Sequence, residues 1–217
     1  MKIGVLGTGM VGQSLARKLA DLGHEVTMGS RAARNLKAAE FVKETGPNAR
    51  AGIFSEAAAF GDLIVLAVNG AVALEALAAA GEANLAGKVL IDITNPLDFS
   101  NGMPPSLIPE LSNTNSLGET IQKTYPNSRV VKALNTMNSA LMVDPSRLSE
   151  PGDVFLCGNS SDAKAQVSKI LKEFGWTQPI DLGDITAARA LEQSLPLWLR
   201  LWGVFGTTDF NFKIVRG

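Results

Sequence analysis

The sequence predicts an α/β protein of the Rossmann type, in which helices cover both faces of a doubly wound, mostly parallel sheet. Short apolar runs alternate with segments of helical periodicity, as expected of βαβ units. A G-x-G-x-x-G motif follows the first apolar run and opens the first helical segment. The predicted strands are Lys2–Leu6, Glu25–Gly29, Ala49–Phe54, Asp62–Val68, Lys88–Thr94, Arg129–Leu134, Asp153–Cys157 and Gln178–Leu182.

Helix-end signals locate the segments between these strands. Leucines repeat at helical spacing from Leu15 to Leu22, and Gly23 then supplies a left-handed stop. Ser116 and Glu119 have the spacing of a capping box, which predicts a helix that starts there.

Two further helices are predicted near the end of the chain. One begins at Ser161 and ends at Gly175. The last runs from Ile185 to Trp202, and Pro196 is expected to bend it. This last helix is apolar around most of its circumference, so we expect it to enter the protein's own cleft or to form a homodimer contact.

The composition is that of a folded globular protein. The 217 residues are 46% hydrophobic and 19% charged, with a formal net charge of −1. This balance argues against nucleic acid as a partner, and no run is long enough to predict a membrane span or a signal peptide. We therefore expect a cytoplasmic protein. The one cysteine, Cys157, lies in an apolar run and is predicted to be a buried, unreactive residue.

The glycine motif Gly7–Gly12 is the strongest indication of function. Gly7 permits the tight turn, Gly9 lets the backbone approach a pyrophosphate, and Gly12 allows close packing of helix on strand. The backbone N–H groups of Thr8–Val11 would then face the phosphates. The motif predicts a dinucleotide site.

The end of the second predicted strand indicates which dinucleotide binds. NAD-specific folds usually place an acid there, whereas this sequence has Ser30 and Arg31. A hydroxyl and a guanidinium suit the 2′-phosphate of NADP, and the guanidinium can also stack on adenine. Arg34, one turn further on, is expected to add positive charge. We predict an NADP(H)-binding Rossmann domain at residues 1–142 and a small C-terminal α/β subdomain at residues 143–217 that completes the cleft.

Asparagines follow three of the predicted strands, at the edge of the sheet where a ligand binds in such folds. Asn69, Asn95 and Asn135 could each hydrogen-bond a ligand or have only a role in a turn. The irregular stretch Asn95–Asn115 starts at the same edge and is a candidate rim of the substrate site.

Ionisable residues near these strand ends favour no acid/base catalyst. Asp92 could be a buried, backbone-bonded carboxylate or a catalytic one, and Lys132 is expected to be a snorkelling surface lysine. The one histidine, His24, follows the first helix on the far side from the glycine motif, so we predict no catalytic histidine and no metal site. Direct hydride transfer fits best, because it chiefly requires two rings to be held close together.

Several segments together resemble NADPH:coenzyme F420 oxidoreductases and the related oxidoreductase domain of Steap-type metalloreductases. They are the glycine motif, Gly29–Arg31, the DITNPL segment Asp92–Leu97, the KALNT segment Lys132–Thr136, Cys157–Asn159 and the ARALEQSLPL segment Ala188–Leu197. The resemblance implies NADP contacts from Thr8, Gly9, Met10, Val11, Ser30 and Arg31, with Val68, Asn69 and Ala133 nearby. It further implies that Asn95, Pro96, Leu97 and Asn135 border the nicotinamide and a deazaflavin or flavin.

The resemblance leaves the second redox partner open. Archaeal deazaflavin enzymes of this type can carry His where Asn135 stands, so coenzyme F420 and a flavin such as FMN or FAD are both candidates. The sequence leaves two alternatives to hydride transfer between NADPH and a deazaflavin or flavin. One is an imine or ketone reductase similar to pyrroline-5-carboxylate reductase, and the other is a non-catalytic NADP(H)-binding redox sensor.

Overall fold

The computed structural model describes all 217 residues and places the eight predicted strands in one sheet. Its order is β10-β9-β8-β5-β4-β1-β2-β3, and every neighbouring pair is parallel except β8 with β9. The predicted Rossmann-type fold is therefore confirmed. The strands are β1 (Lys2–Leu6), β2 (Glu25–Ser30), β3 (Ala49–Ile53), β4 (Leu63–Leu66), β5 (Val89–Asp92), β8 (Arg129–Ala133), β9 (Phe155–Gly158) and β10 (Ile180–Asp181).

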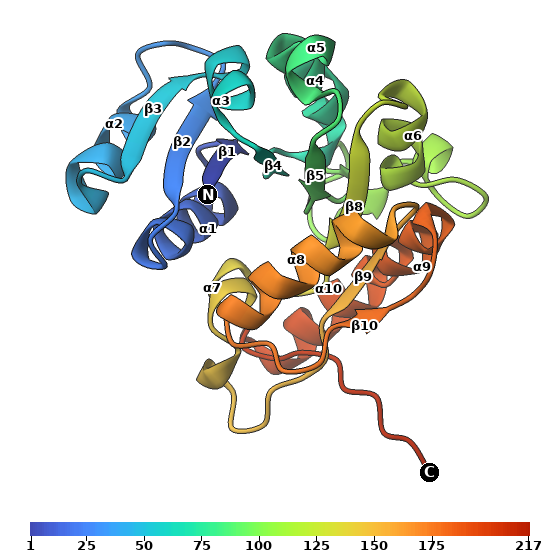
Figure 1. Ribbon diagram of the computed structural model, residues 1–217. Helices are drawn as coiled ribbons and strands as arrows, with labels where there is room; N and C mark the ends of the chain where they lie inside the picture. The colour runs from blue at the N-terminus through green and yellow to red at the C-terminus, as the bar shows by residue number, and fades with distance from the viewer.

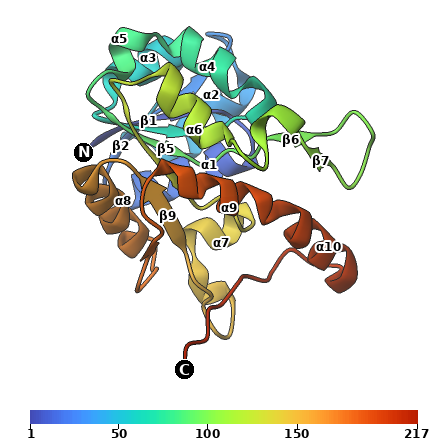
Figure 2. The same cartoon turned by 90° about the vertical axis from the view of Figure 1, so that its right-hand side faces the viewer.

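Helices cover both faces of the sheet, and each face has its own apolar core (Figures 1 and 2). One core is built on α1 (Met10–Asp21), α2 (Leu36–Thr45), α7 (Ser139–Val143) and α8 (Ser161–Glu173). The other is built on α3 (Phe54–Phe60), α4 (Ala73–Ala80), α5 (Glu82–Leu85), α6 (Leu117–Thr124) and α9 (Ala188–Gln193). No helix is both long and apolar enough to cross a membrane. Burial of both strand faces explains the continuous apolar runs of the sequence.

The stretch between β5 and α6 is more ordered than expected. It forms a short hairpin of β6 (Leu97–Asp98) and β7 (Ser106–Leu107), followed by the 3-10 turn η2 (Pro109–Leu111). The base of the hairpin is closed where the Ile108 amide donates to the Pro96 carbonyl at 2.8 Å. Figure 2 shows the hairpin and α10 projecting on the same side of the molecule.

The last predicted helix is divided rather than bent. It comprises the 3-10 turn η4 (Ile185–Ala187), α9 and α10 (Leu195–Phe205). The division falls at Ser194, which places Pro196 in the first turn of α10. Proline is tolerated there because the first amides of a helix have no intrahelical acceptor, whereas inside a helix its ring would clash with the preceding turn.

The C-terminal part of the chain extends the same sheet. Strands β9 and β10 follow the predicted boundary after residue 142, which falls inside α7, and β9 pairs directly with β8. Because both parts share one sheet, the predicted division into a Rossmann domain (residues 1–142) and a C-terminal subdomain (residues 143–217) stays a prediction. The remaining 3-10 turns are η1 (Gly70–Val72) and η3 (Pro145–Arg147).

Candidate functional site

Two of the three motif glycines are crowded by neighbouring backbone, and the third is open. Gly7 has φ +131°, and a Cβ there would lie 2.3 Å from the Ala67 carbonyl oxygen. A Cβ on Gly12 would lie equally close to the backbone of Gly7, whereas one on Gly9 would meet no atom within 4 Å. Gly7 and Gly12 are thus needed for turn shape and packing. No contact within the chain requires a glycine at position 9, so the absence of a side chain there fits a backbone that a ligand approaches closely.

The backbone amides of the turn point to an anion. Helix α1 begins at Met10 without a side-chain cap, and the N–H groups of Thr8, Gly9, Met10 and Val11 donate to no acceptor within the chain. Met10 is also largely exposed. Free amides at the positive end of a helix bind phosphate.

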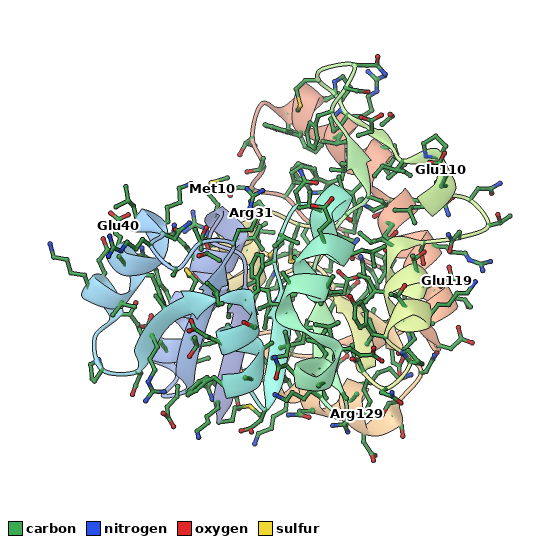
Figure 3. The ribbon with its side chains drawn as sticks, turned by 90° about the horizontal axis from the view of Figure 1, so that it is seen from above. Met10, Arg31, Glu40, Glu110, Glu119 and Arg129 are labelled. Atoms are coloured by element: carbon green, nitrogen blue, oxygen red, sulfur yellow. The ribbon has the colours of Figure 1, made fainter.

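A cavity of about 600 Å³, here called the Arg31 cavity, opens beside these amides. It brings Gly7, Thr8 and Gly9 together with Ser30 and Arg31 from the end of β2. Figure 3 shows Arg31 labelled next to Met10 and far from Glu119. Ser30 is buried and donates its hydroxyl to the Ala32 carbonyl at 2.6 Å, so its oxygen can still accept a hydrogen bond.

A second cavity of about 490 Å³, here called the Asn135 cavity, adjoins the first. The two share Gly9, Ala67, Val68 and Asn69, so together they form one groove along the carboxyl ends of the strands. Uncharged side chains line the whole Asn135 cavity. They are Met10, Val11, Ile93, Thr94, Asn95, Leu97, Phe99, Asn135, Met137, Met142, Leu195 and Trp198, beside the shared residues and Gly70.

Asn95 and Asn135 face each other across the ends of β5 and β8. The Asn95 Nδ2 donates to the Asn135 carbonyl at 2.9 Å, and the Asn135 Nδ2 donates to Asn95 Oδ1 at 2.9 Å. Asn135 is 2% exposed, and its Oδ1 has no partner. Asn69 has a turn role as well, since its Oδ1 accepts from the Ala71 amide.

Several of the predicted site residues line neither cavity. Arg34 is exposed outside the Arg31 cavity, Gly12 packs against Gly7, and Ala133 is buried in the core. Pro96 meets the hairpin through its carbonyl. These residues can affect a ligand only through the backbone or through long-range charge. His24 is remote from the groove, as predicted, with Nε2 3.1 Å from Glu173 Oε2.

Lys132 contradicts the prediction of a snorkelling surface lysine. It is 0% exposed, and its Nζ lies 2.9 Å from Asp92 Oδ2 and 2.8 Å from Glu192 Oε1. The sheet register pairs Lys132 with Asp92 on neighbouring central strands. Helix α9 packs over this pair and places Glu192 against Lys132. Asp92 is therefore a buried structural carboxylate, and it also accepts from the Thr94 amide and hydroxyl.

Charge partners keep this buried lysine protonated. Burial lowers the pKa of Lys132, but the adjacent carboxylates of Asp92 and Glu192 outweigh it and raise that pKa above its usual value. Lys132 also donates to the Thr94 carbonyl at 2.5 Å, and Thr94 lines the Asn135 cavity. Glu192 accepts from the Leu117 and Gly118 amides at the start of α6. The network thus ties α9 and α6 to the strand ends.

Comparison with known proteins shows the family. Residues 2–96 match the family model described as NADP oxidoreductase, coenzyme F420-dependent. The F420-dependent NADP reductase of Methanocaldococcus jannaschii is 30% identical over 213 residues, which cover 93% of this chain and 92% of the relative. The chain belongs to the F420-dependent NADP reductase family. It is accordingly an NADP-dependent oxidoreductase.

Other relatives of the family share the whole fold or only a domain. A crystal structure from Arthrobacter sp. FB24, for which F420-dependent NADP reductase activity has been proposed, is 54% identical, covers both chains completely and has a TM-score of 0.94. The metalloreductase STEAP3 of Rattus norvegicus is 29% identical over 91% of this chain. The chain spans only 38% of that relative's length.

Cys157 is expected to be inert to thiol reagents in this family member. Burial raises the pKa of its thiol to about 12, only partly offset by nearby Lys132, so almost no thiolate forms near neutral pH. We expect iodoacetamide at mildly alkaline pH to leave the folded protein unmodified and to alkylate it fully in denaturant. Mass spectrometry of both samples checks this, and rapid modification of the folded protein would refute the buried location.

Sequence reasoning did not find several of the groove residues. Asn35, Phe54, Val72 and Glu75 line the Arg31 cavity, and Trp198 lines the Asn135 cavity. They come from helix starts or from α10, which tertiary packing brings over the strand ends. For the Lys132 network a signal was present in the sequence, because Asp92 and Lys132 carry opposite charges and are each the third residue from the end of a strand predicted to be buried.

Proposed function

We propose that this protein transfers hydride between NADPH and coenzyme F420. The observation that carries the proposal is the groove itself, in which a phosphate-binding turn leads directly into a chamber lined by uncharged side chains. The family membership and the Arthrobacter structure support it.

The Arg31 cavity has the groups that NADP requires. The free amides of Thr8–Val11 would bind the pyrophosphate, and Gly9 leaves room for its approach. Arg31 would pair with the 2′-phosphate. The Ser30 hydroxyl oxygen would accept a hydrogen bond from a ribose hydroxyl or from a protonated oxygen of the 2′-phosphate. The exposed Arg34 adds positive charge without direct contact.

The Asn135 cavity would hold the nicotinamide against a second flat ring. When bound, NADPH supplies a hydride, and the oxidised deazaflavin takes up that hydride and one proton to give NADP⁺ and the reduced deazaflavin. The chain's own part is to hold and orient: Leu97 and Val68 supply apolar contact, and the Asn95–Asn135 pair fixes the ends of β5 and β8. Apolar side chains also exclude water from the space between two rings, which favours direct transfer.

The uncharged lining argues against the imine or ketone reductase alternative. Reduction of an imine or ketone needs a proton donor near the substrate, and general acids are ionisable or hydroxyl side chains held within hydrogen-bond reach. The hydroxyl of Thr94 already donates to Asp92. Hydride transfer to a deazaflavin gives an anion delocalised over the ring, which can take its proton from solvent afterwards, so the lining need not hold a proton donor.

Turnover with defined acceptors tests the proposal. NADPH oxidation is followed with coenzyme F420, FMN, FAD and a ferric chelate as separate acceptors. We expect oxidation with coenzyme F420 and much slower rates with the others. Oxidation with a flavin or the ferric chelate alone would replace the proposed acceptor, and binding of NADPH without any turnover would support the redox-sensor alternative.

The homodimer stays a prediction, and α10 supplies the surface for it. Leu197, Trp202, Val204 and Phe205 are apolar and exposed on this helix. Burial of such a patch in a dimer would remove apolar area from water. Light scattering after size exclusion is expected to give the dimer mass for the wild type and the monomer mass for Phe205→Glu. A monomeric wild type would contradict the prediction.

A further inference from the structure

The polar side chains of the Asn135 cavity fall into two groups. Most are satisfied inside the chain: the Thr94 hydroxyl donates to Asp92, and the Asn95 amide is bonded at both of its polar atoms to Asn135. Asn69 Oδ1 accepts from the Ala71 amide. Apart from the exposed Asn69 Nδ2, these groups have little hydrogen-bonding capacity left for a ligand ring.

Two buried atoms are different. Asn135 Oδ1 and Trp198 Nε1 have no hydrogen-bond partner, although both residues line the cavity and are at least nine-tenths buried. One is an acceptor and the other is a donor. A buried polar atom without a partner costs stability, so such an atom beside a cavity calls for a ligand or a bound water.

Trp198 is held firmly in its position. Its ring stacks on Phe210, with centroids 5.2 Å apart and an interplanar angle of 28°. The segment that carries Phe210 is in turn fixed, since Asn138 Nδ2 donates to the Thr208 carbonyl at 2.6 Å. Trp198 also lies six residues after Glu192, and Glu192 is held in place by its ion pair with Lys132. A donor held this way is preorganised for a ligand.

Trp198 reaches the Asn135 cavity from the side where the ring of the hydride acceptor, the second ring, would lie. The dinucleotide runs along the strand ends through Gly9, Val68 and Asn69, the residues that both cavities share. Trp198 instead comes from α10, which projects beyond the sheet beside the β6–β7 hairpin (Figure 2). The second ring therefore has α10 on its outer side.

We infer that Trp198 and Asn135 recognise the pyrimidinedione ring of the deazaflavin, with the indole N–H donating to a ring carbonyl and Asn135 Oδ1 accepting from the ring N–H. This ring offers acceptors and a donor together, which matches the two buried unpartnered atoms of the cavity. The inference rests on the proposed function and adds the residues that choose the second substrate. Trp198 is a specificity-determining residue in this scheme.

Binding measured without turnover tests the inference. Calorimetric titration of oxidised coenzyme F420 into the protein with NADP⁺ present gives the Kd for the wild type, Trp198→Phe and Trp202→Phe. Trp198→Phe keeps an aromatic ring but loses the N–H together with part of the apolar area of the indole. Trp202→Phe makes the same change on the same helix, outside the cavity, and is the matched control. We expect Trp198→Phe to raise the Kd for coenzyme F420 about 10-fold and to leave the Kd for NADP⁺ unchanged.

Asn135→Ala is expected to weaken binding of coenzyme F420 selectively as well. The inference is overturned if Trp198→Phe binds coenzyme F420 like the wild type, or if NADP⁺ binding weakens as much, since the indole would then face the nicotinamide. Binding that responds as expected in a protein without turnover would leave the inference standing and refute the proposed function. The same titration with FMN shows whether a flavin with this ring is recognised in the same way.

Discussion

Replacing Lys132 by Met is expected to lower the free energy of unfolding by about 3–5 kcal/mol. The substitution leaves Asp92 and Glu192 buried without their cation, and an uncompensated charge in the interior is far more costly than a lost surface pair. It also removes the bond to the Thr94 carbonyl at the edge of the Asn135 cavity. Urea denaturation followed by circular dichroism measures the change.

Lys169→Met is the matched control for this prediction. Lys169 lies on α8 and is exposed, so its replacement is expected to change stability by no more than about 0.5 kcal/mol. A triple variant with Lys132→Met, Asp92→Asn and Glu192→Gln should recover part of the loss, because the unpaired charges are gone. Equal stability of Lys132→Met and Lys169→Met would refute the buried ion-pair network.

The network also has a defined pH dependence. The pKa of Lys132 is raised in the folded protein, so its contribution to stability is fully present below the ordinary lysine pKa. That contribution is lost as the pH rises through the folded value. We expect the stability difference between the wild type and Lys132→Met to shrink at strongly alkaline pH.

Replacing Arg31 by Ala is expected to raise the Kd for NADPH about 10- to 100-fold, because charge-assisted hydrogen bonds to the 2′-phosphate are lost. The Kd for NADH should change only slightly, since NADH has no phosphate at this position. Fluorescence titration of both nucleotides measures the two constants.

Arg34→Ala separates direct contact from general positive charge. Arg34 lies three residues after Arg31, in the exposed loop before α2 and outside the Arg31 cavity, so this variant should bind NADPH with a Kd close to that of the wild type. An Arg31→Ala protein that loses affinity for NADPH and NADH to the same extent would show that Arg31 contacts only the part that the two nucleotides share.

The sheet and the phosphate turn could be predicted from the sequence because their signals are local. Each strand that is buried on both faces is a continuous apolar run, and Gly7, Gly9 and Gly12 have spacing that only one turn geometry requires. Ser30 and Arg31 follow a strand whose end was predicted to within one residue. These features needed no knowledge of how distant segments meet.

The other half of the groove depends on tertiary contacts. The sequence places Lys132 and Asp92 in two predicted strands, but only the packing of α9 places Glu192 over Lys132. Trp198 belongs to a helix whose apolar circumference does not tell which face enters the cleft. Pro196 signalled a disturbance of this helix, but whether it bends or divides depends on how α9 is anchored.

The most direct test of the central claim is the fate of the transferred hydrogen. NADPH that carries deuterium at both C4 positions is incubated with the protein and oxidised coenzyme F420, and the reduced deazaflavin is analysed by mass spectrometry. Direct transfer along the groove predicts one deuterium on the reduced deazaflavin. Reduced deazaflavin that carries hydrogen from water, or NADPH that stays unoxidised, would contradict the account.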